Sequence, residues 1–430
     1  MGCMNKLIKK LSRHFEIFNE TRRIRRCYES HIARIRNRRA GTKIKVLFIV
    51  SEIAKWKEQS LYEAMARSED FDPVVAISAY NGQSEGQVPN DRLEDVLLAA
   101  EAFFDRMGDR HVRAVKITGG KRIFSDLSEF NPDIVYYTEP WMGSESRQTP
   151  EWVSSFALTC YSPYYVPNYS SLKEACKLPL HRFLWNYYCM GESEAKYFTS
   201  AYYPFRNWRT TTRFVGVGHP ALDYFHLNQR RSSGSKTIIY APHCTIAGGV
   251  PTWIHHYGTF RWSGNYMLEY AKSRPEIKWV FKPHPQLRYG IKRAELMSDE
   301  EIDAYYSEWR RIGTVCEDSN YQELFLDSSA MITDCGSFLS EYGATERPII
   351  HLISSDNKYK PLSSLTGLYD TYYKVHNTNE LITTLKMVID RREDPMRERR
   401  VEALKSTGMI GVNASEEIIR HLRNQLSQHS

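Results

Sequence analysis

The sequence predicts an α/β fold of two doubly wound, Rossmann-like domains preceded by a basic amphipathic helix. Short apolar runs of strand length alternate with segments of helical spacing along most of the chain, which indicates mostly parallel sheets covered on both faces. A polar, Gly/Ser-rich stretch at residues 226–235 interrupts this alternation and is typical of a linker. The chain of 430 residues is also longer than a single hydrophobic core usually supports. We therefore expect an N-terminal segment (1–42), a first domain (43–225), the linker and a second domain (236–430).

The N-terminal segment carries all of the excess positive charge. Residues 1–43 hold 13 Lys and Arg against three Glu, a net charge of +10, so the rest of the chain is close to −3. Apolar residues at helical spacing run through the segment: Leu7, Leu11, Phe15, Phe18, Ile24, Tyr28, Ile32 and Ile35. This pattern favours a helix on an anionic membrane surface through residues 1–40, where each basic residue contributes about 1 kcal/mol.

Two other interpretations of the N-terminal segment stay open, a nucleic-acid-binding arm and a solvated helix packed on the protein body. The membrane surface is preferred, and nucleic acid is not expected as a partner, because a phosphate backbone makes no use of a Leu and Phe stripe.

Other features of the whole chain exclude several protein classes. No apolar run approaches the ~20 residues of a transmembrane helix. The basic start lacks the apolar region of a signal peptide. The eight cysteines show neither a CxxC pair nor metal-ligand spacing. We therefore expect a cytosolic chain with reduced cysteines, no metal and no cofactor.

The elements of the first domain follow from the apolar runs and from turn signals such as Asn-Pro-Asp before the fourth strand. Strands are predicted at 44–50, 73–78, 112–117, 133–138, 157–161, 185–189 and 213–217. Helices are predicted at 59–67, 92–106, 123–130 and 192–199.

The second domain repeats the alternation. Its predicted strands are 236–240, 277–281, 314–316, 330–333, 349–353 and 371–375, and its predicted helices are 267–273, 299–311, 321–327, the one after residue 336, 380–391 and 416–426. Two doubly wound domains facing a cleft are the GT-B-like arrangement of nucleotide-sugar transferases.

The stretch 331–342 is the centre of this second domain. A buried strand leads to Asp334, then to the small loop Cys335, Gly336 and Ser337, then to a helix carrying Glu341. Unpaired N–H groups and the positive dipole end at a helix start suit a phosphate or pyrophosphate. A carboxylate one turn later can accept hydrogen bonds from ribose hydroxyls. An ordinary αβ turn is the alternative, and the upstream motifs at 240–243 (Tyr-Ala-Pro-His) and 282–285 (Lys-Pro-His-Pro) favour function.

Several short motifs follow one another in the second half of the chain, at 216–220 with Asp223, 240–242, 281–285, 320–325, 332–341, 347–350 and 411–416. In the order and spacing of these motifs, roughly residues 185–425 resemble the CDP-glycerol glycerophosphotransferase family, the teichoic-acid primases and polymerases.

This resemblance implies a donor site in the second domain. His284 contacts the donor phosphates, Asp334 and Ser337 line the pyrophosphate loop, and Glu341 holds the ribose. The chemistry agrees, because a diphosphate leaving group needs N–H donors and cationic partners, which His284 and nearby Lys282 supply.

For both histidines of the expected donor site, a purely structural role is the alternative to donor binding. A turn histidine that caps a strand is the alternative for His284, although prolines on both sides fix its backbone. His243 follows a strand end, and two roles stay open for it: donor binding, and packing or capping.

The first domain departs from the family pattern. Members carry a Trp-His-Gly-like turn whose histidine is the presumed base, and the corresponding stretch 158–163 has no histidine. Tyr161, His219, Glu52 and Glu139 are candidates for deprotonating the acceptor hydroxyl. Glu139 is preferred because it is a carboxylate at a strand end.

We therefore expect a peripheral membrane enzyme at the cytoplasmic face of the cell membrane. It moves a glycerol-phosphate or related alditol-phosphate group from a CDP-linked donor to a lipid-linked or cell-surface polysaccharide acceptor. The alternatives are a GT-B glycosyltransferase that uses a UDP- or CMP-sugar, and an inactive scaffold of polysaccharide assembly.

Overall fold

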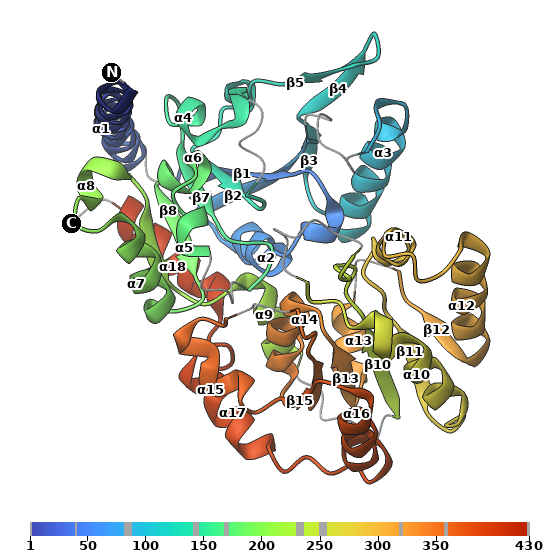
Figure 1. The fold of residues 1–430 in the computed structure, drawn as a ribbon. Helices are drawn as coiled ribbons and strands as arrows, with labels where there is room; N and C mark the ends of the chain where they lie inside the picture. Colours follow the sequence, from blue (N-terminus) through green and yellow to red (C-terminus); the bar gives the residue numbers. More distant parts are fainter. Residues whose placement is uncertain are drawn as a thin grey trace. The chain divides into compact units, whose positions relative to one another are not determined.

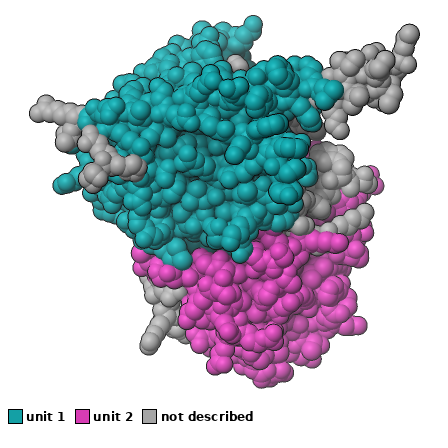
Figure 2. Space-filling model, turned by 90° about the vertical axis from the view of Figure 1, so that its left-hand side faces the viewer, with its two compact units in different colours: residues 1–165, 171–223, 412–430 teal, residues 166–170, 224–411 magenta. Residues whose placement is uncertain are grey.

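The computed structural model describes residues 2–38, 41–80, 88–140, 146–166, 172–228, 236–248, 256–317, 321–356 and 360–427. The chain divides into two compact units, which are coloured separately in Figure 2. Unit 1 comprises residues 1–165, 171–223 and 412–430, and unit 2 comprises residues 166–170 and 224–411. The last helix thus groups with unit 1, whereas the predicted domains place it in the second. Residues 229–235 of the predicted linker lie outside the described residues.

Unit 1 is built on a seven-stranded parallel sheet (Figure 1). Its strands, in the spatial order β3-β2-β1-β6-β7-β8-β9, are β3 (His111–Arg113), β2 (Phe71–Ile77), β1 (Ile44–Val50), β6 (Ile134–Tyr137), β7 (Leu158–Tyr161), β8 (Asn186–Cys189) and β9 (Arg213–Gly216). The strand order reverses between β1 and β6. In doubly wound sheets, ligands bind at such a point, beyond the carboxyl ends of the strands.

Helices cover both faces of this sheet, because alternate residues of β1 are buried on opposite sides. Val46, Phe48 and Val50 belong to a core shared with α1, α2, α3 and α18, and Leu47 and Ile49 to a core shared with α4, α6 and α7. The α-helices of unit 1 are α1 (Gly2–Arg36), α2 (Gln59–Arg67), α3 (Asn90–Met107), α4 (Pro150–Val153), α5 (Leu172–Ala175), α6 (Pro179–Arg182), α7 (Glu192–Thr199), α8 (Arg206–Arg209), the first half of α9 (Pro220–Leu227) and α18 (Ala414–Leu426).

Asp223 on α9 fixes the start of α18. Its carboxylate accepts hydrogen bonds from the N–H groups of Ala414 and Ser415, at 2.7 and 2.8 Å, and from the Ser415 hydroxyl at 2.5 Å. These bonds satisfy donors that the first turn of a helix leaves unpaired. Two motifs that lie almost 200 residues apart in the chain therefore meet in one buried contact.

A β-hairpin corrects one predicted helix. β4 (Val115–Thr118) pairs antiparallel with β5 (Lys121–Phe124), and Gly119 and Gly120 between them have φ of 56° and 71°. Two residues with positive φ are typical of a tight hairpin loop. The helix predicted at 123–130 is therefore wrong over its first residues, and a 3-10 turn, η2 (Leu127–Phe130), follows.

The second half of α1 packs on the rest of unit 1. Ile24, Tyr28 and Ile35 are buried. The Tyr28 hydroxyl donates to the carbonyl of Phe183 at 2.6 Å and lies 2.6 Å from the Thr159 hydroxyl. A helix packed on the protein body therefore describes this half of the segment.

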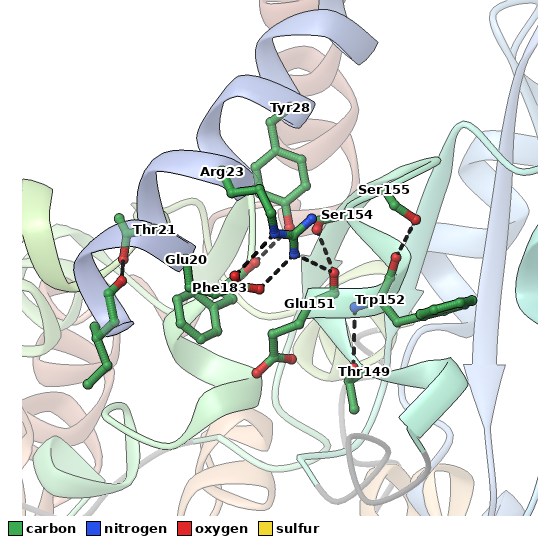
Figure 3. Close-up of polar contacts among 11 residues, drawn as sticks. Glu20, Thr21, Arg23, Tyr28, Thr149, Glu151, Trp152, Ser154, Ser155 and Phe183 are labelled. Carbon is green, nitrogen blue, oxygen red and sulfur yellow. Dashed lines mark hydrogen bonds and ion pairs between the residues drawn. The ribbon is translucent and has the colours of Figure 1, made fainter. Parts of the chain in front are cut away.

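Arg23 on α1 also contacts the rest of unit 1. Figure 3 shows the Arg23 guanidinium between the Glu20 carboxylate, at 2.7 Å, and the carbonyl of Glu151, at 3.1 Å. Earlier on the helix, Leu11 and Phe15 are 60% and 64% exposed. The segment thus has one docked part and one exposed part.

Unit 2 contains a six-stranded parallel sheet (Figure 1). Its strands, in spatial order, are β12 (Gly313–Val315), β11 (Lys278–Phe281), β10 (Thr237–Ala241), β13 (Ala330–Thr333), β14 (Ile349–Leu352) and β15 (Tyr373–Val375). The strand order reverses between β10 and β13, so the same rule places a ligand site at their carboxyl ends.

The helices of unit 2 confirm the predicted α/β alternation. They are α10 (Phe260–Lys272), α11 (Leu287–Arg293), α12 (Asp299–Ile312), α13 (Gln322–Asp327), α14 (Gly336–Glu341), α15 (Thr366–Tyr369), α16 (Thr378–Leu385), which continues into a π-helical turn (Lys386–Asp390), and α17 (Arg397–Ser406). α11, α15 and α17 were not predicted. None of the described helices combines the length and the apolar character needed to cross a membrane.

Candidate functional site

The candidate site residues of unit 2 follow the carboxyl ends of neighbouring strands. Lys282 comes directly after β11 and Asp334 directly after β13. His243 lies two residues beyond β10, and His284 lies three residues beyond β11. Parallel pairing of β10 with β11 and with β13 brings these ends to one edge of the sheet. The residues therefore flank the point at which the strand order reverses.

His243 and His284 lie side by side, with ring centroids 4.7 Å apart. The Nδ1 atom of His284 accepts the N–H of Gln286 at 3.1 Å. The Nδ1 atom of His243 accepts the N–H of Thr245 at 3.2 Å and lies 2.8 Å from the Thr245 hydroxyl. A neutral imidazole that accepts at Nδ1 carries its proton on Nε2. Each ring therefore offers an Nε2–H donor.

Both imidazoles are held neutral. Burial lowers the pKa of His284 to about 4, and the nearby Lys282 charge adds to this effect. Burial and the neighbouring His284 lower the pKa of His243 well below its usual value. Two neutral N–H donors beside each other suit an anionic oxygen, because both can donate hydrogen bonds to it although neither ring carries a charge.

Cys244 joins the two histidines in a group whose possible ligand atoms lie within 4.8 Å of one another. His, His and Cys are ligands that zinc prefers. Zinc binding would require the Cys244 thiol to lose its proton and each imidazole to offer a nitrogen lone pair. Burial raises the pKa of the Cys244 thiol to about 12, and each Nδ1 atom already accepts a backbone N–H. With their protons on Nε2, the two rings present N–H donors that suit an anion.

Asp334 braces the loop that carries His243. One carboxylate oxygen accepts the N–H of His243 at 2.6 Å, and the other accepts the N–H and the hydroxyl of Thr259, at 2.6 and 2.7 Å. Burial raises the Asp334 pKa to about 6, and these hydrogen bonds oppose the rise. The structure therefore gives Asp334 a positioning role, because both of its oxygens are already engaged.

Lys282, Tyr321 and Glu341 form a second buried group. The Tyr321 hydroxyl donates to the Glu341 carboxylate at 2.6 Å, and the Lys282 ammonium lies 4.8 Å from the centre of the Tyr321 ring. Burial, followed by the Glu341 charge, raises the pKa of Tyr321 well above its usual value. Glu341 is thus held by Tyr321, at the end of the same helix that Gly336 begins.

The loop at Gly336 and Ser337 opens a short helix. α14 spans six residues, and the Ser337 hydroxyl lies 3.4 Å from the Cys335 sulfur. A helix this short develops only a small dipole, so its start attracts an anion less strongly than the sequence argument assumed. The histidine pair is the stronger anion-binding feature of this edge.

In unit 1, Glu139 is buried beyond the end of β6, beside the end of β1. Its Oε1 atom accepts the N–H groups of Ser51 and Glu52, at 2.9 and 3.1 Å. Its Oε2 atom accepts the Tyr80 hydroxyl and lies 3.6 Å from the Lys55 ammonium. Burial raises the Glu139 pKa to about 7, against the lowering effect of Lys55. A carboxyl group with such a pKa can exchange a proton at neutral pH.

The other candidate bases have less suitable surroundings. Tyr161 is a core residue of β7 whose ring packs against His181 and Tyr187. His219 is buried, and burial lowers its pKa to about 4. Glu52 pairs with Lys55 at 2.9 Å. Glu139 therefore remains the candidate with both a suitable pKa and a polar network.

Sequence reasoning missed the residues that position these groups. Thr245 and Thr259 hold His243 and Asp334, and Lys55 and Tyr80 hold Glu139. Tyr80 carries a usable signal, because it follows the strand next to β1 by three residues. A search for polar side chains just beyond the strands at the reversal point and beyond their next neighbours in the sheet would have found it.

The sequence profile of the CDP-glycerol:poly(glycerophosphate) glycerophosphotransferase family matches residues 202–423, more than half of the chain. The chain belongs to this family. It is accordingly a transferase of the CDP-glycerol-using kind, and the resemblance noted from the motifs is confirmed. The matched segment includes every candidate residue of unit 2 and excludes Glu139. Among curated proteins, none matches the chain.

Solved structures of this fold include two that align with nearly the whole chain. UDP-GlcNAc 2-epimerase from Neisseria meningitidis, bound to UDP-GlcNAc, is 13% identical, with a TM-score of 0.53 over 89% of this chain and 100% of that chain. A variant of the wall teichoic acid polymerase TagF, soaked with CDPG, is 13% identical, with a TM-score of 0.53 over 98% of each chain. At such identities the likeness concerns the fold alone, and it confirms the predicted α/β class.

Proposed function

We propose that this glycerophosphotransferase-family protein moves a glycerol-phosphate or related alditol-phosphate group from a CDP-linked donor to a lipid-linked or cell-surface polysaccharide acceptor. In this reaction an acceptor hydroxyl oxygen bonds to the phosphorus that bears the alditol. The bond from that phosphorus to the CMP oxygen breaks, CMP leaves with the bonding electron pair, and the hydroxyl proton passes to a base. We assign the base role to Glu139.

The observation that carries the donor assignment is the histidine pair. Two Nε2–H donors on adjacent rings can bind the oxygens of one diphosphate, on which negative charge builds as CMP departs. Lys282 adds a positive charge close to His284. In this proposal Asp334 positions His243. Gly336 and Ser337 border the diphosphate, and Glu341 accepts hydrogen bonds from the ribose hydroxyls.

A nucleotide screen by thermal shift tests the donor. CDP-glycerol at 100 times its dissociation constant is expected to stabilise the protein by about 2.7 kcal/mol, and CDP-ribitol is the closest competitor. Stabilisation by UDP- or CMP-sugars in place of CDP-alditols would indicate the glycosyltransferase alternative. A protein that is stabilised by none of them, and consumes no donor in the presence of membranes, would be the inactive scaffold.

A surface of unit 1 supports membrane attachment at the inner face. We define the aromatic–basic patch by the exposed residues Leu11, Phe15, Tyr203, Phe205 and Trp208, together with Phe18, Arg22 and Arg209. The Phe18 and Trp208 rings are 5.5 Å apart, and α1 packs against α8 here. A hollow of about 400 Å³ lies beside them and is lined in part by Lys177, Arg182 and Arg209. Aromatic rings beside basic side chains are typical of proteins at anionic lipid surfaces.

Introducing negative charges into this patch tests the attachment. Phe15→Glu combined with Trp208→Glu is expected to lower binding to vesicles of anionic phospholipid by at least about tenfold, because each change removes an inserting ring and adds a repelled charge. Cosedimentation with the vesicles measures the loss. Leu98→Glu, at an exposed position on α3, is the matched control and is expected to bind like the parent protein. Equal sedimentation of all three proteins would contradict the attachment.

A further inference from the structure

Glu139 is buried too deeply to touch an acceptor itself. Its residue has 0% exposed surface, and both carboxylate oxygens accept hydrogen bonds. Tyr80, which donates its hydroxyl to Oε2, is partly exposed. The Lys55 ammonium donates to the same Tyr80 oxygen at 2.7 Å. The hydroxyl of this partly exposed tyrosine is therefore hydrogen-bonded directly to the buried carboxylate.

We propose that Tyr80 is the residue that contacts the acceptor hydroxyl and relays its proton to Glu139, which makes unit 1 the acceptor-activating part of the protein; this inference rests on the proposed transferase function. The acceptor O–H bond breaks as its oxygen bonds to phosphorus. The proton goes to the Tyr80 oxygen, and the proton that Tyr80 held goes to Glu139 Oε2. Glu139 returns a proton to water through Tyr80 after CMP has left. Tyr80 is then a catalytic residue, and Glu139 acts through it.

Lys55 has two effects within this relay. Its charge stabilises the negative charge that develops on the Tyr80 oxygen during transfer, and it lies 4.8 Å from the Tyr80 ring centre. It also lowers the pKa of Glu139, which keeps the carboxylate able to receive a proton near neutrality. The relay therefore replaces the histidine that the sequence lacks at 158–163.

The charged groups that face Glu139 determine its pH dependence. Lys55 and Glu52 lie on the 3-10 turn η1 (Ile53–Lys55) and its N-cap, Tyr80 follows β2, and Glu58 precedes α2. Lys55 lowers the Glu139 pKa and Glu52 raises it. Burial raises the pKa of Glu58 well above its usual value. The relay needs ionised Glu139, so CMP release is expected to rise with pH through about 7 and then level off.

The test measures CMP release from CDP-glycerol between pH 5 and 9, with a poly(glycerol phosphate) oligomer as acceptor and with water alone. Tyr80→Phe and Glu139→Gln are each expected to lower release by about 10²–10⁴-fold and to remove the acidic limb. Lys55→Met is expected to move the limb up by about one pH unit or more, and Glu52→Gln to move it down. Tyr289→Phe, at an exposed tyrosine of unit 2, is the matched control.

Donor binding, measured by thermal shift with CDP-glycerol, separates this inference from the proposed function. Unchanged binding in all variants, with loss of turnover and opposite limb shifts for Lys55→Met and Glu52→Gln, supports the relay. Full turnover of Tyr80→Phe, or an acidic limb that stays in place in both charge variants, overturns the relay and leaves the donor site intact. A parent protein that binds CDP-glycerol but releases no CMP at any pH overturns it as well. A parent protein that does not bind CDP-glycerol overturns the proposed function, and the relay with it.

Discussion

Replacing His284 with alanine is expected to lower CMP release from CDP-glycerol by about 10²–10³-fold, the usual effect of removing one donor to a developing anion. The ring is neutral at pH 7, because burial and Lys282 lower its pKa to about 4. It therefore acts as an N–H donor and not as a counter-charge. His284→Gln keeps an N–H group and is expected to retain more activity than the alanine variant. Single-turnover CMP release measures both.

The matched control for this prediction is His376→Ala, because His376 is a half-exposed histidine of unit 2 that pairs with Glu380. It is expected to leave turnover unchanged. His243→Ala should resemble His284→Ala if the two rings bind one diphosphate. An active His284→Ala protein would remove the donor assignment, whereas loss confined to His284 would leave His243 with a packing role.

The sequence predicted which candidate residues gather at one edge of the sheet better than it predicted the contacts that they make there. Polar residues after apolar runs identified His243, His284 and Asp334, because parallel strands bring their carboxyl ends to one edge. The partners of Asp334 could not be predicted in this way. Thr259 lies 75 residues before Asp334 and comes to it only through the packing of α10. The orientation of a carboxylate depends on such contacts, and spacing along the chain does not contain them.

The same limit applies to unit 1. Glu139 was predicted as a strand-end carboxylate, but its partner Tyr80 lies 59 residues earlier. α18 was predicted as a helix at 416–426, and its sequence does not state which sheet it covers. In the structure, the Asp223 carboxylate accepts the first N–H groups of α18, and this contact joins two of the family motifs and places α18 on unit 1. Local patterns identify elements, whereas tertiary hydrogen bonds decide which elements meet.

The second large effect is expected from deletion of the N-terminal helix, and it concerns the stability of unit 1. A chain lacking residues 1–40 is expected to lose the folded state of unit 1, because the deletion removes Ile24, Tyr28 and Ile35 from its core. Each lost buried side chain costs about 2–5 kcal/mol, and three together approach the roughly 5–15 kcal/mol that stabilise a whole domain. The apolar spacing of residues 24–35 suits a lipid surface as well as a protein core, so the sequence alone could not separate them.

Circular dichroism melts and limited proteolysis measure this loss. The matched control is a chain that begins at Leu11, which keeps every contact of α1 with unit 1 named above and is expected to melt like the full chain. A cooperative melt of the protein without residues 1–40 at the parental temperature would show that α1 is a detachable anchor. If the shortened chain unfolds, its failure to sediment with vesicles carries no information about membranes, because an unfolded unit 1 also loses the aromatic–basic patch. Point substitutions at Phe15 and Trp208 are therefore the decisive test of attachment, since both side chains are largely exposed and their replacement leaves the buried half of the helix in place.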